Sequence, residues 1–182
     1  MEGVMKQTVW NITLASLITL VAYIALYAIW GAILGGVENP TLKLFLIALM
    51  TTAAFSFFLL YTSKIKNSVG EDEVVSDYKD SEYVSFVDDF KMIIKRESKM
   101  LVCIAMIVLI CFAFNTFDVI IFGKKTISFP TLIYAPMCLF DSAIDIPFVG
   151  YAVSAVLDCV LYIIFLLIYR KKKYNYWMKN KV

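Results

Sequence analysis

The chain has 182 residues, of which 61% are hydrophobic and 18% charged, and its formal net charge is +2. A soluble domain is about 45–50% apolar, so this composition indicates a protein of the lipid bilayer, and the near-neutral charge gives no basis for nucleic-acid binding. Histidine is absent, which removes the commonest metal ligand and general acid or base. The four cysteines are scattered, so we expect no disulfide framework, no metal site and no cofactor.

The first apolar stretch, residues 7–37, carries no charge. It is too long for the apolar core of a signal peptide, about 7–15 residues, and therefore predicts a first membrane helix over residues 10–34. Gly31 and Gly35 form a small-x-x-x-small pair, a spacing that lets helix backbones approach closely. The pair suits dimerisation or packing within the chain, and we favour packing within the chain.

The second apolar stretch, residues 44–63, lies between two lysines and predicts a second span. Ala48, Thr52 and Ser56 recur along it at intervals of four, again a stripe of small residues suited to close packing. Residues 1–63 therefore form an N-terminal transmembrane hairpin in our interpretation.

Residues 64–99 hold half of the charged residues and predict a cytoplasmic loop. Within this loop, residues 83–97 have the periodicity of an amphipathic helix. Ile93 and Glu97 fall on its apolar face and Asp89 falls elsewhere. Such a helix either lies on the membrane surface or extends the next span into the cytoplasm.

The C-terminal hairpin is expected over residues 100–169. Its first span, residues 100–122, places Asn115 and Asp118 on one face, and we expect Asp118 to be hydrated near the headgroups. The outer loop, residues 123–146, is apolar but interrupted by prolines, so it is predicted to be interfacial or re-entrant, with Cys138 near the outer surface.

The last span carries one ionisable residue, Asp158, about midway through the bilayer. A charge at that depth costs about 2.5–3.5 kcal/mol by insertion scales, so the carboxyl is expected to face the bundle interior in its neutral form. Gly150, Ser154 and Tyr162 share its face at intervals of four, and we expect the Ser154 and Tyr162 hydroxyls to bond it. The tail, residues 170–182, is basic and aromatic and anchors the helix at an anionic leaflet.

The predicted fold is an all-α integral membrane protein with four transmembrane helices in two antiparallel hairpins and a cytoplasmic amphipathic helix before the third span. With this topology, 14 of the 17 Lys and Arg residues lie inside, as the distribution of cations in membrane proteins requires. Both termini are then cytoplasmic, and we expect a bacterial plasma membrane as the location.

Three functions fit this fold. We rank first an accessory or regulatory subunit that associates with another membrane protein, and second an oligomeric transporter or channel protomer that uses Asp158 as a proton or cation site. An intramembrane enzyme ranks last, because no catalytic constellation is present. No second carboxylate is expected at the depth of Asp158, which weakens the last two. The candidate polar site comprises Asp158, Ser154, Tyr162, Asn115 and Asp118, and the candidate packing residues are Gly31, Gly35 and Gly150.

Overall fold

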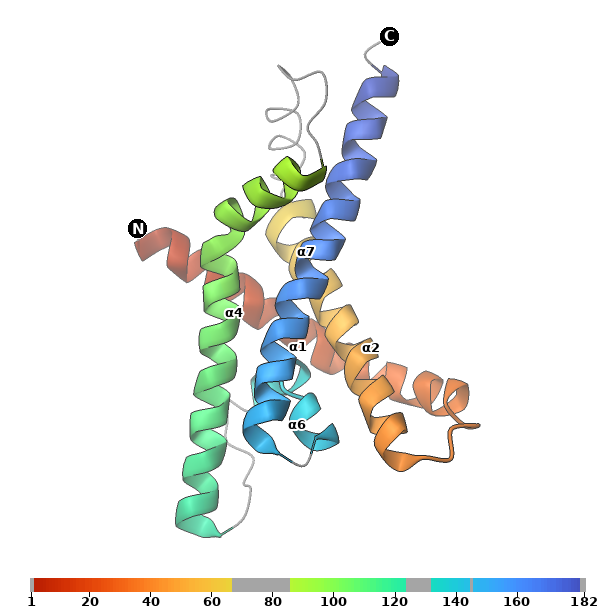
Figure 1. The fold of residues 1–182 in the computed structure, drawn as a ribbon, viewed down its shortest axis with the longest axis vertical. Helices are drawn as coiled ribbons and strands as arrows, with labels where there is room; N and C mark the ends of the chain where they lie inside the picture. The colour runs from red at the N-terminus through yellow and green to blue at the C-terminus, as the bar shows by residue number, and fades with distance from the viewer. Residues whose placement is uncertain (1, 67–85, 124–131, 145, 181–182) are drawn as a thin grey trace.

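The computed structural model describes residues 2–66, 86–123, 132–144 and 146–180, and these residues are helical with short connections (Figure 1). In chain order, the elements are α1 (Glu2–Ile33), α2 (Pro40–Leu60), the π-helical turn η1 (Tyr61–Ile65), α4 (Phe86–Phe122), the 3-10 turn η2 (Ala135–Met137), α6 (Phe140–Ala143) and α7 (Pro147–Asn180). The all-helical prediction is confirmed for these residues. The predicted loop between the second and third spans lies mostly outside them.

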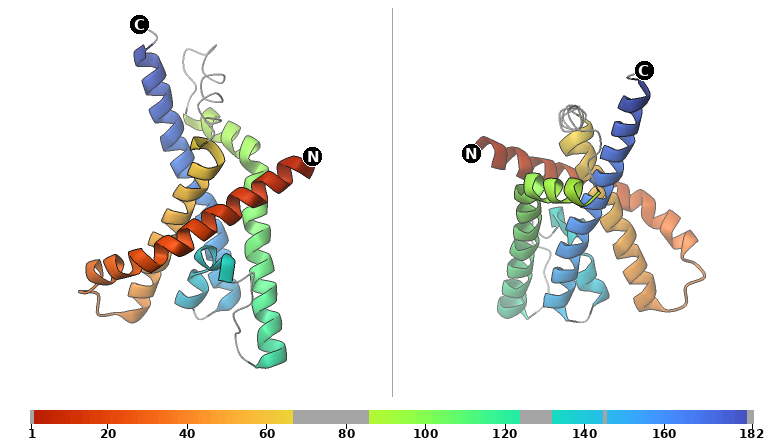
Figure 2. Two further views of the ribbon diagram at one scale, coloured as in Figure 1. Left: turned by 180° about the vertical axis from the view of Figure 1, so that it is seen from behind. Right: turned by 45° about the horizontal axis from the view of Figure 1, so that its top comes forward.

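Within the described residues, three helical stretches are long and apolar enough to cross a membrane: Pro40–Ile65, Asp88–Ile121 and Pro147–Tyr176. They run along the long axis of the molecule, whereas α1 crosses one face of the other helices obliquely (Figures 1 and 2). The fold therefore has the apolar helices of a membrane protein. The membrane orientation of α1, and with it the fourth span, remains a prediction.

The turn between α1 and α2 follows from its residues. Asn39 caps α2, because its side-chain Oδ1 accepts a hydrogen bond from the Leu42 amide at 3.1 Å. Pro40 follows at the first helical position, where its missing N–H costs nothing. The chain thus reverses within a few residues and packs α2 against α1.

Helices α4 and α7 pack together as an antiparallel pair. Three contacts fix their register: Cys159 Sγ to the Leu101 carbonyl, Tyr162 to Glu97, and Arg170 to Asp89. As the residue number rises along α7, the number of its partner on α4 falls. The two helices therefore run antiparallel, whereas the hairpin of membrane spans stays a prediction.

The expected amphipathic helix and the third span are one continuous helix, α4. Its first turns lie across the direction of the rest, as the right-hand view of Figure 2 shows. Ile93 and Glu97 are buried, whereas Phe90 and Ile94 stay exposed. Asp89, which the periodicity placed off the apolar face, is also buried. Some residues of the expected apolar face therefore pack against the other helices, and others are exposed on the surface of the molecule.

Residues 132–144 fold back against the bundle and contact α1, α2 and α7. Met137 and Phe140 are completely buried, and the Ser16 hydroxyl of α1 donates to the Ile133 carbonyl at 2.7 Å. Cys138 is half-buried against the core, and its predicted place near the outer membrane surface stays a prediction. A hydrogen bond with the Cys111 thiol, burial, and the nearby carboxyls raise the pKa of the Cys138 thiol well above its ordinary value.

Glycine matters at one close approach. A Cβ at Gly150 would lie 2.6 Å from the Asp141 Cα and 2.9 Å from the Phe140 carbonyl oxygen, so only glycine lets α7 approach α6 this closely. A Cβ at Gly31 would meet nothing within 4 Å, and one at Gly35 would meet only backbone of its own helix. The Gly31–Gly35 pair therefore makes no close packing within the described chain, contrary to our preference.

Candidate intramembrane carboxylate site

The centre of the site is Asp158 on α7. Its residue surface is 0% exposed, and Ser154 and Tyr162, one turn to either side, are equally buried. The intervals of four along α7 place these side chains on one helix face, and that face is the one turned into the bundle. The burial expected for Asp158 is thus what the structure shows.

Helix α2 covers this face with its own stripe of small polar residues. Ser56 donates a hydrogen bond to the Asp158 backbone carbonyl at 3.4 Å, which places α2 directly against α7 at this level. Thr52, one turn away, is also buried. The small side chains of α2 permit this close contact between the two helices.

The hydrogen bonds expected for the Asp158 side chain are absent. Among the described residues, neither Oδ1 nor Oδ2 of Asp158 has a hydrogen-bond partner. The Ser154 and Thr52 hydroxyls are also buried without a partner in this part of the chain. The Tyr162 hydroxyl bonds elsewhere. The Asp158 carboxyl is therefore buried near hydroxyl groups, but it makes no hydrogen bond that links the described helices.

Tyr162 instead connects the site to a second carboxylate. Its hydroxyl donates to Glu97 Oε2 on α4 at 3.0 Å. The other oxygen of Glu97 lies 2.8 Å from Lys64 Nζ, and both of these side chains are at most 10% exposed. A buried ion pair is thus joined through one phenol to the face that carries Asp158.

The π-helical turn η1 presents Lys64 to this cluster. The Lys66 amide donates to the Tyr61 carbonyl at 2.9 Å, a five-residue step in place of the usual four. The Thr62 hydroxyl contacts the Asn11 carbonyl of α1 at 3.4 Å. A π-turn rotates the residues after it relative to the preceding α-helix, and such turns are frequent at functional sites.

A second buried ion pair lies two turns beyond Tyr162 along α7. Arg170 Nε and Nη2 both donate to Asp89 Oδ1, at 3.1 and 2.9 Å. Arg170 is only 3% exposed. The sequence indicated a cation in the basic tail and a carboxylate on a polar face, whereas the structure buries both and binds α4 to α7 through them.

The other predicted polar residues are not part of this site. Leu101 of α4 lies level with Cys159, and Asn115 is 14 residues farther on, about 21 Å along the helix. Asn115 donates to the Tyr151 hydroxyl at 2.7 Å. Asp118 is buried, and its Oδ2 has no partner among the described residues, so the expectation of a hydrated carboxylate is wrong.

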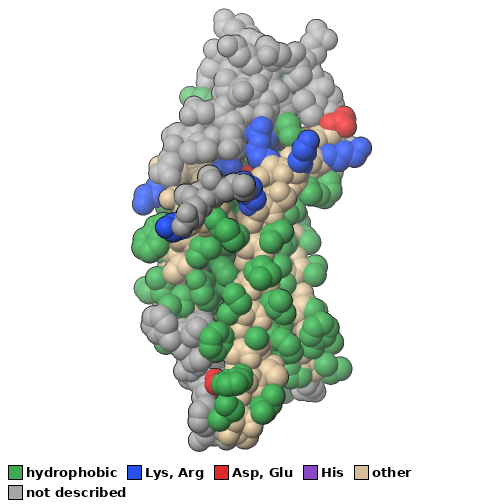
Figure 3. Space-filling model, turned by 90° about the vertical axis from the view of Figure 1, so that its left-hand side faces the viewer, with side chains coloured by type: hydrophobic (Ala, Val, Ile, Leu, Met, Phe, Trp, Pro, Cys, Tyr) green, Lys and Arg blue, Asp and Glu red, His purple; other side chains and the backbone are tan. Residues whose placement is uncertain are grey.

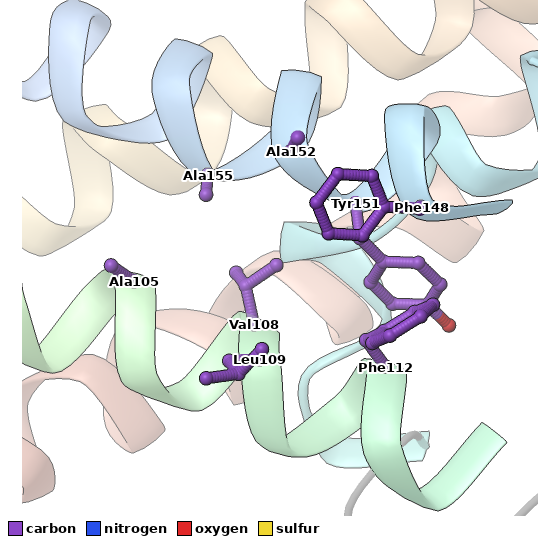
Figure 4. A pocket seen from close by; sticks show the side chains of 8 residues that line it. All are labelled: Ala105, Val108, Leu109, Phe112, Phe148, Tyr151, Ala152 and Ala155. Carbon is purple, nitrogen blue, oxygen red and sulfur yellow. The ribbon is translucent and has the colours of Figure 1, made fainter. Parts of the chain in front are cut away.

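An apolar groove runs between α4 and α7 beyond this polar region (Figure 4). It has a volume of about 110 Å³. Its walls combine small and aromatic side chains: Ala105, Val108, Leu109, Phe112, Phe148, Tyr151, Ala152 and Ala155. Phe112 makes edge-to-face contacts with both Phe148 and Tyr151. Asp158 is not among the residues that line the groove.

In the described part of the chain, no three His, Cys, Asp or Glu side chains lie close enough together to hold a metal ion. Comparisons with protein-family models, curated proteins and solved structures found no match for this chain. Its function must therefore be inferred from the geometry of its own residues.

The sequence did not indicate that Lys64, Glu97 and Tyr162 meet. Two of these residues had been interpreted separately, Lys64 as the boundary of a span and Tyr162 as a partner of Asp158. One signal was available, because Glu97 is a carboxylate on the apolar face of a predicted helix. A charge in that position requires a buried partner, and a lysine of a neighbouring helix was the natural candidate.

Proposed function

We propose that this chain is a four-span membrane protein in which Asp158 binds and releases a proton, as the protomer of a proton-coupled transporter. The supporting observation is that Asp158 is completely buried with both carboxyl oxygens unpartnered among the described residues. Buried polar groups that serve only stability are normally hydrogen-bonded. The Asp158 carboxyl makes no hydrogen bond to the described helices, although it lies at the depth of the bilayer in our topology. A role in binding and releasing a proton explains why an ionisable group stands there.

A proton also fits the confined surroundings better than a hydrated metal cation. It requires no cavity, and it removes the charge that burial makes costly. Four helices of one chain enclose little space for water, so a transport path would form within an oligomer of this chain. The transported substrate is left open.

The proposed topology places both termini in the cytoplasm. The start of α1 and the end of α7 lie toward the same end of the molecule (Figure 1). On the face that Figure 3 shows, Lys and Arg side chains gather toward that end, and most of the coloured side chains below them are hydrophobic. Cationic flanks remain inside, so this end is assigned to the cytoplasm. Access to a tag after Val182 from outside intact cells would contradict this orientation.

The test of the proton site compares Asp158→Asn with Asp158→Leu in proteoliposomes, using a pH-sensitive dye and an imposed proton gradient. We expect both variants to assemble normally and to lose proton flux. Asp118→Asn is the matched control, since Asp118 is a buried carboxyl on another helix, and it should retain flux. Normal flux in Asp158→Asn would refute the proposal.

The groove of Figure 4 favours a second function, the accessory subunit. Its alanines would allow a transmembrane helix of another membrane protein to approach closely. Ala152→Leu would fill the groove, whereas Val156→Leu, on an exposed position of the same helix, would not. A stoichiometric partner that co-purifies in mild detergent with the wild type and Val156→Leu, but not with Ala152→Leu, would support this function. Purification of the chain alone or as a homo-oligomer would count against it.

A further inference from the structure

We infer that Glu97 is a second proton-binding carboxylate and that the Tyr162 hydroxyl passes the proton between it and Asp158. This inference rests on the proposed role of Asp158. Tyr162 lies one helical turn from Asp158 on the same buried face of α7. Its hydroxyl already donates to Glu97 Oε2 at 3.0 Å. Two carboxylates on different helices are therefore separated by one phenol, which can donate and accept a proton at the same oxygen.

Lys64 gives Glu97 two alternative states. In the structure, the Lys64 ammonium lies 2.8 Å from Glu97 Oε1 and neutralises it. A proton arriving on Glu97 replaces this neutralisation, because the protonated carboxyl no longer attracts the ammonium. Proton arrival on Glu97 therefore weakens this contact between η1 and α4.

A second buried cation near this cluster contacts a different carboxylate. Arg170, on α7, holds Asp89 with two hydrogen bonds. That pair lies two turns nearer the end of α7 than Tyr162 does, and it leaves Lys64 as the cation in contact with Glu97. From α1, the contact with the π-turn comes from the neutral Asn11 backbone. Among the described residues, Tyr162, Glu97 and Lys64 are therefore joined by direct contacts, and Asp158 lies one helical turn from Tyr162 on the same buried face.

The proposed step conserves protons and charge. The protonated Asp158 carboxyl gives its proton to the Tyr162 oxygen, while the phenolic proton of Tyr162 moves to Glu97 Oε2. Asp158 ends as a carboxylate, Glu97 as a neutral acid, and Tyr162 is unchanged. Asp158 does not bond Tyr162 in this structure, so the step requires rotation of the Asp158 side chain toward the phenol. The neighbouring Ser154 and Thr52 hydroxyls lack partners in the described chain and can stabilise the carboxylate that results.

The decisive variant is Tyr162→Phe, which removes one oxygen and leaves the ring in place. Positioned proton donors and acceptors contribute roughly 10²–10⁴-fold in rate, so we expect proton flux in proteoliposomes to fall by about a hundredfold. Tyr151→Phe is the matched control, because Tyr151 is a buried tyrosine about three turns from Tyr162 along α7 and is bonded to Asn115. It should leave flux unchanged.

A second measurement follows Glu97 directly. Infrared difference spectra of the Asp158→Asn protein should show a titrating carboxylic-acid band that disappears when Glu97→Gln is added. Glu97→Gln alone should lose flux like Tyr162→Phe. If Glu97→Gln misfolds because the buried ion pair with Lys64 is broken, the Lys64→Gln, Glu97→Gln double variant restores assembly and should still lack flux.

The outcomes distinguish this inference from the function it rests on. Loss of flux in Asp158→Asn, with flux within about twofold of wild type in both Tyr162→Phe and the double variant, would overturn the inference and leave Asp158 as the proton site. Retained flux in Asp158→Asn would overturn both. Loss of flux in all three, with Tyr151→Phe normal, supports both.

Discussion

Replacement of Gly150 by alanine gives the sharpest test of how α7 meets the segment folded back against it. The added methyl carbon would lie 2.6 Å from the Asp141 Cα and 2.9 Å from both the Asp141 nitrogen and the Phe140 carbonyl oxygen. All three are backbone atoms, so no side chain can rotate away to relieve the contact. Ordinary van der Waals contact begins at about 3.4 Å, and α6 would have to move by most of an ångström.

Overpacking of this kind costs about 1–3 kcal/mol, and a contact with rigid backbone belongs at the upper end. The gain in helix propensity from Gly to Ala, at most about 1 kcal/mol, offsets only part of it. We therefore expect Gly150→Ala to lose about 1–2 kcal/mol in unfolding free energy. The measurement is an SDS-unfolding titration in mixed micelles, followed by helical circular dichroism.

Gly31→Ala is the matched control, because a Cβ there would meet nothing within 4 Å. It should be as stable as the wild type or slightly more so. Equal stability of Gly150→Ala and the wild type would refute the close approach of α7 to α6. A loss of dimer in Gly31→Ala, with monomer stability intact, would show that the Gly31–Gly35 face serves a second copy of the chain.

Two further predictions concern buried groups. Asp89→Asn breaks the buried ion pair with the Arg170 guanidinium and should cost about 3–5 kcal/mol. Asp88→Asn, on an exposed neighbour, should change the same SDS-unfolding midpoint little; equal effects would contradict the burial of the pair. The raised pKa of Cys138 keeps its thiol protonated at neutral pH, so an impermeant maleimide should label it slowly. The labelling rate should still rise with pH above the pH at which an ordinary thiol ionises. Fast labelling at pH 7 would place Cys138 at the surface instead.

Much of the helical layout could be predicted from apolar length and charge, because both are local properties of the sequence. Residues 44–63 and 100–122 predicted two of the three helices that can span a bilayer, and the run before Arg170 predicted the third. The intervals of four around Asp158 also predicted its buried face. The periodicity along one helix shows which residues share a face. An ionisable group in an apolar span avoids the lipid, so the face that carries it is expected to turn into the bundle.

Contacts between helices could not be predicted in the same way. Lys64 and Glu97 stand on different helices, and the π-turn rotates Lys64 away from the phase that a regular α-helix would give. The register between α4 and α7 decides whether Tyr162 meets Asp158 or Glu97, and no periodicity within one helix contains that register. Residues 132–144 were hard to place for another reason, since a short apolar run with prolines fits an interfacial segment as well as one packed inside a bundle.

The hydrogen bonds between α1 and the segment folded back against it bear on the order of assembly during synthesis. Ser16 bonds the Ile133 carbonyl, 117 residues later in the chain, and Thr13 shares a hydrogen bond with the Tyr134 hydroxyl at 2.7 Å. When α1 leaves the ribosome, neither partner exists. Until Ile133 is made, the Ser16 hydroxyl must bond its own helix backbone or a passing water. A nascent chain halted before residue 132 would therefore expose an unfinished face of its first helix, where membrane chaperones and proteases can distinguish it from the completed protein.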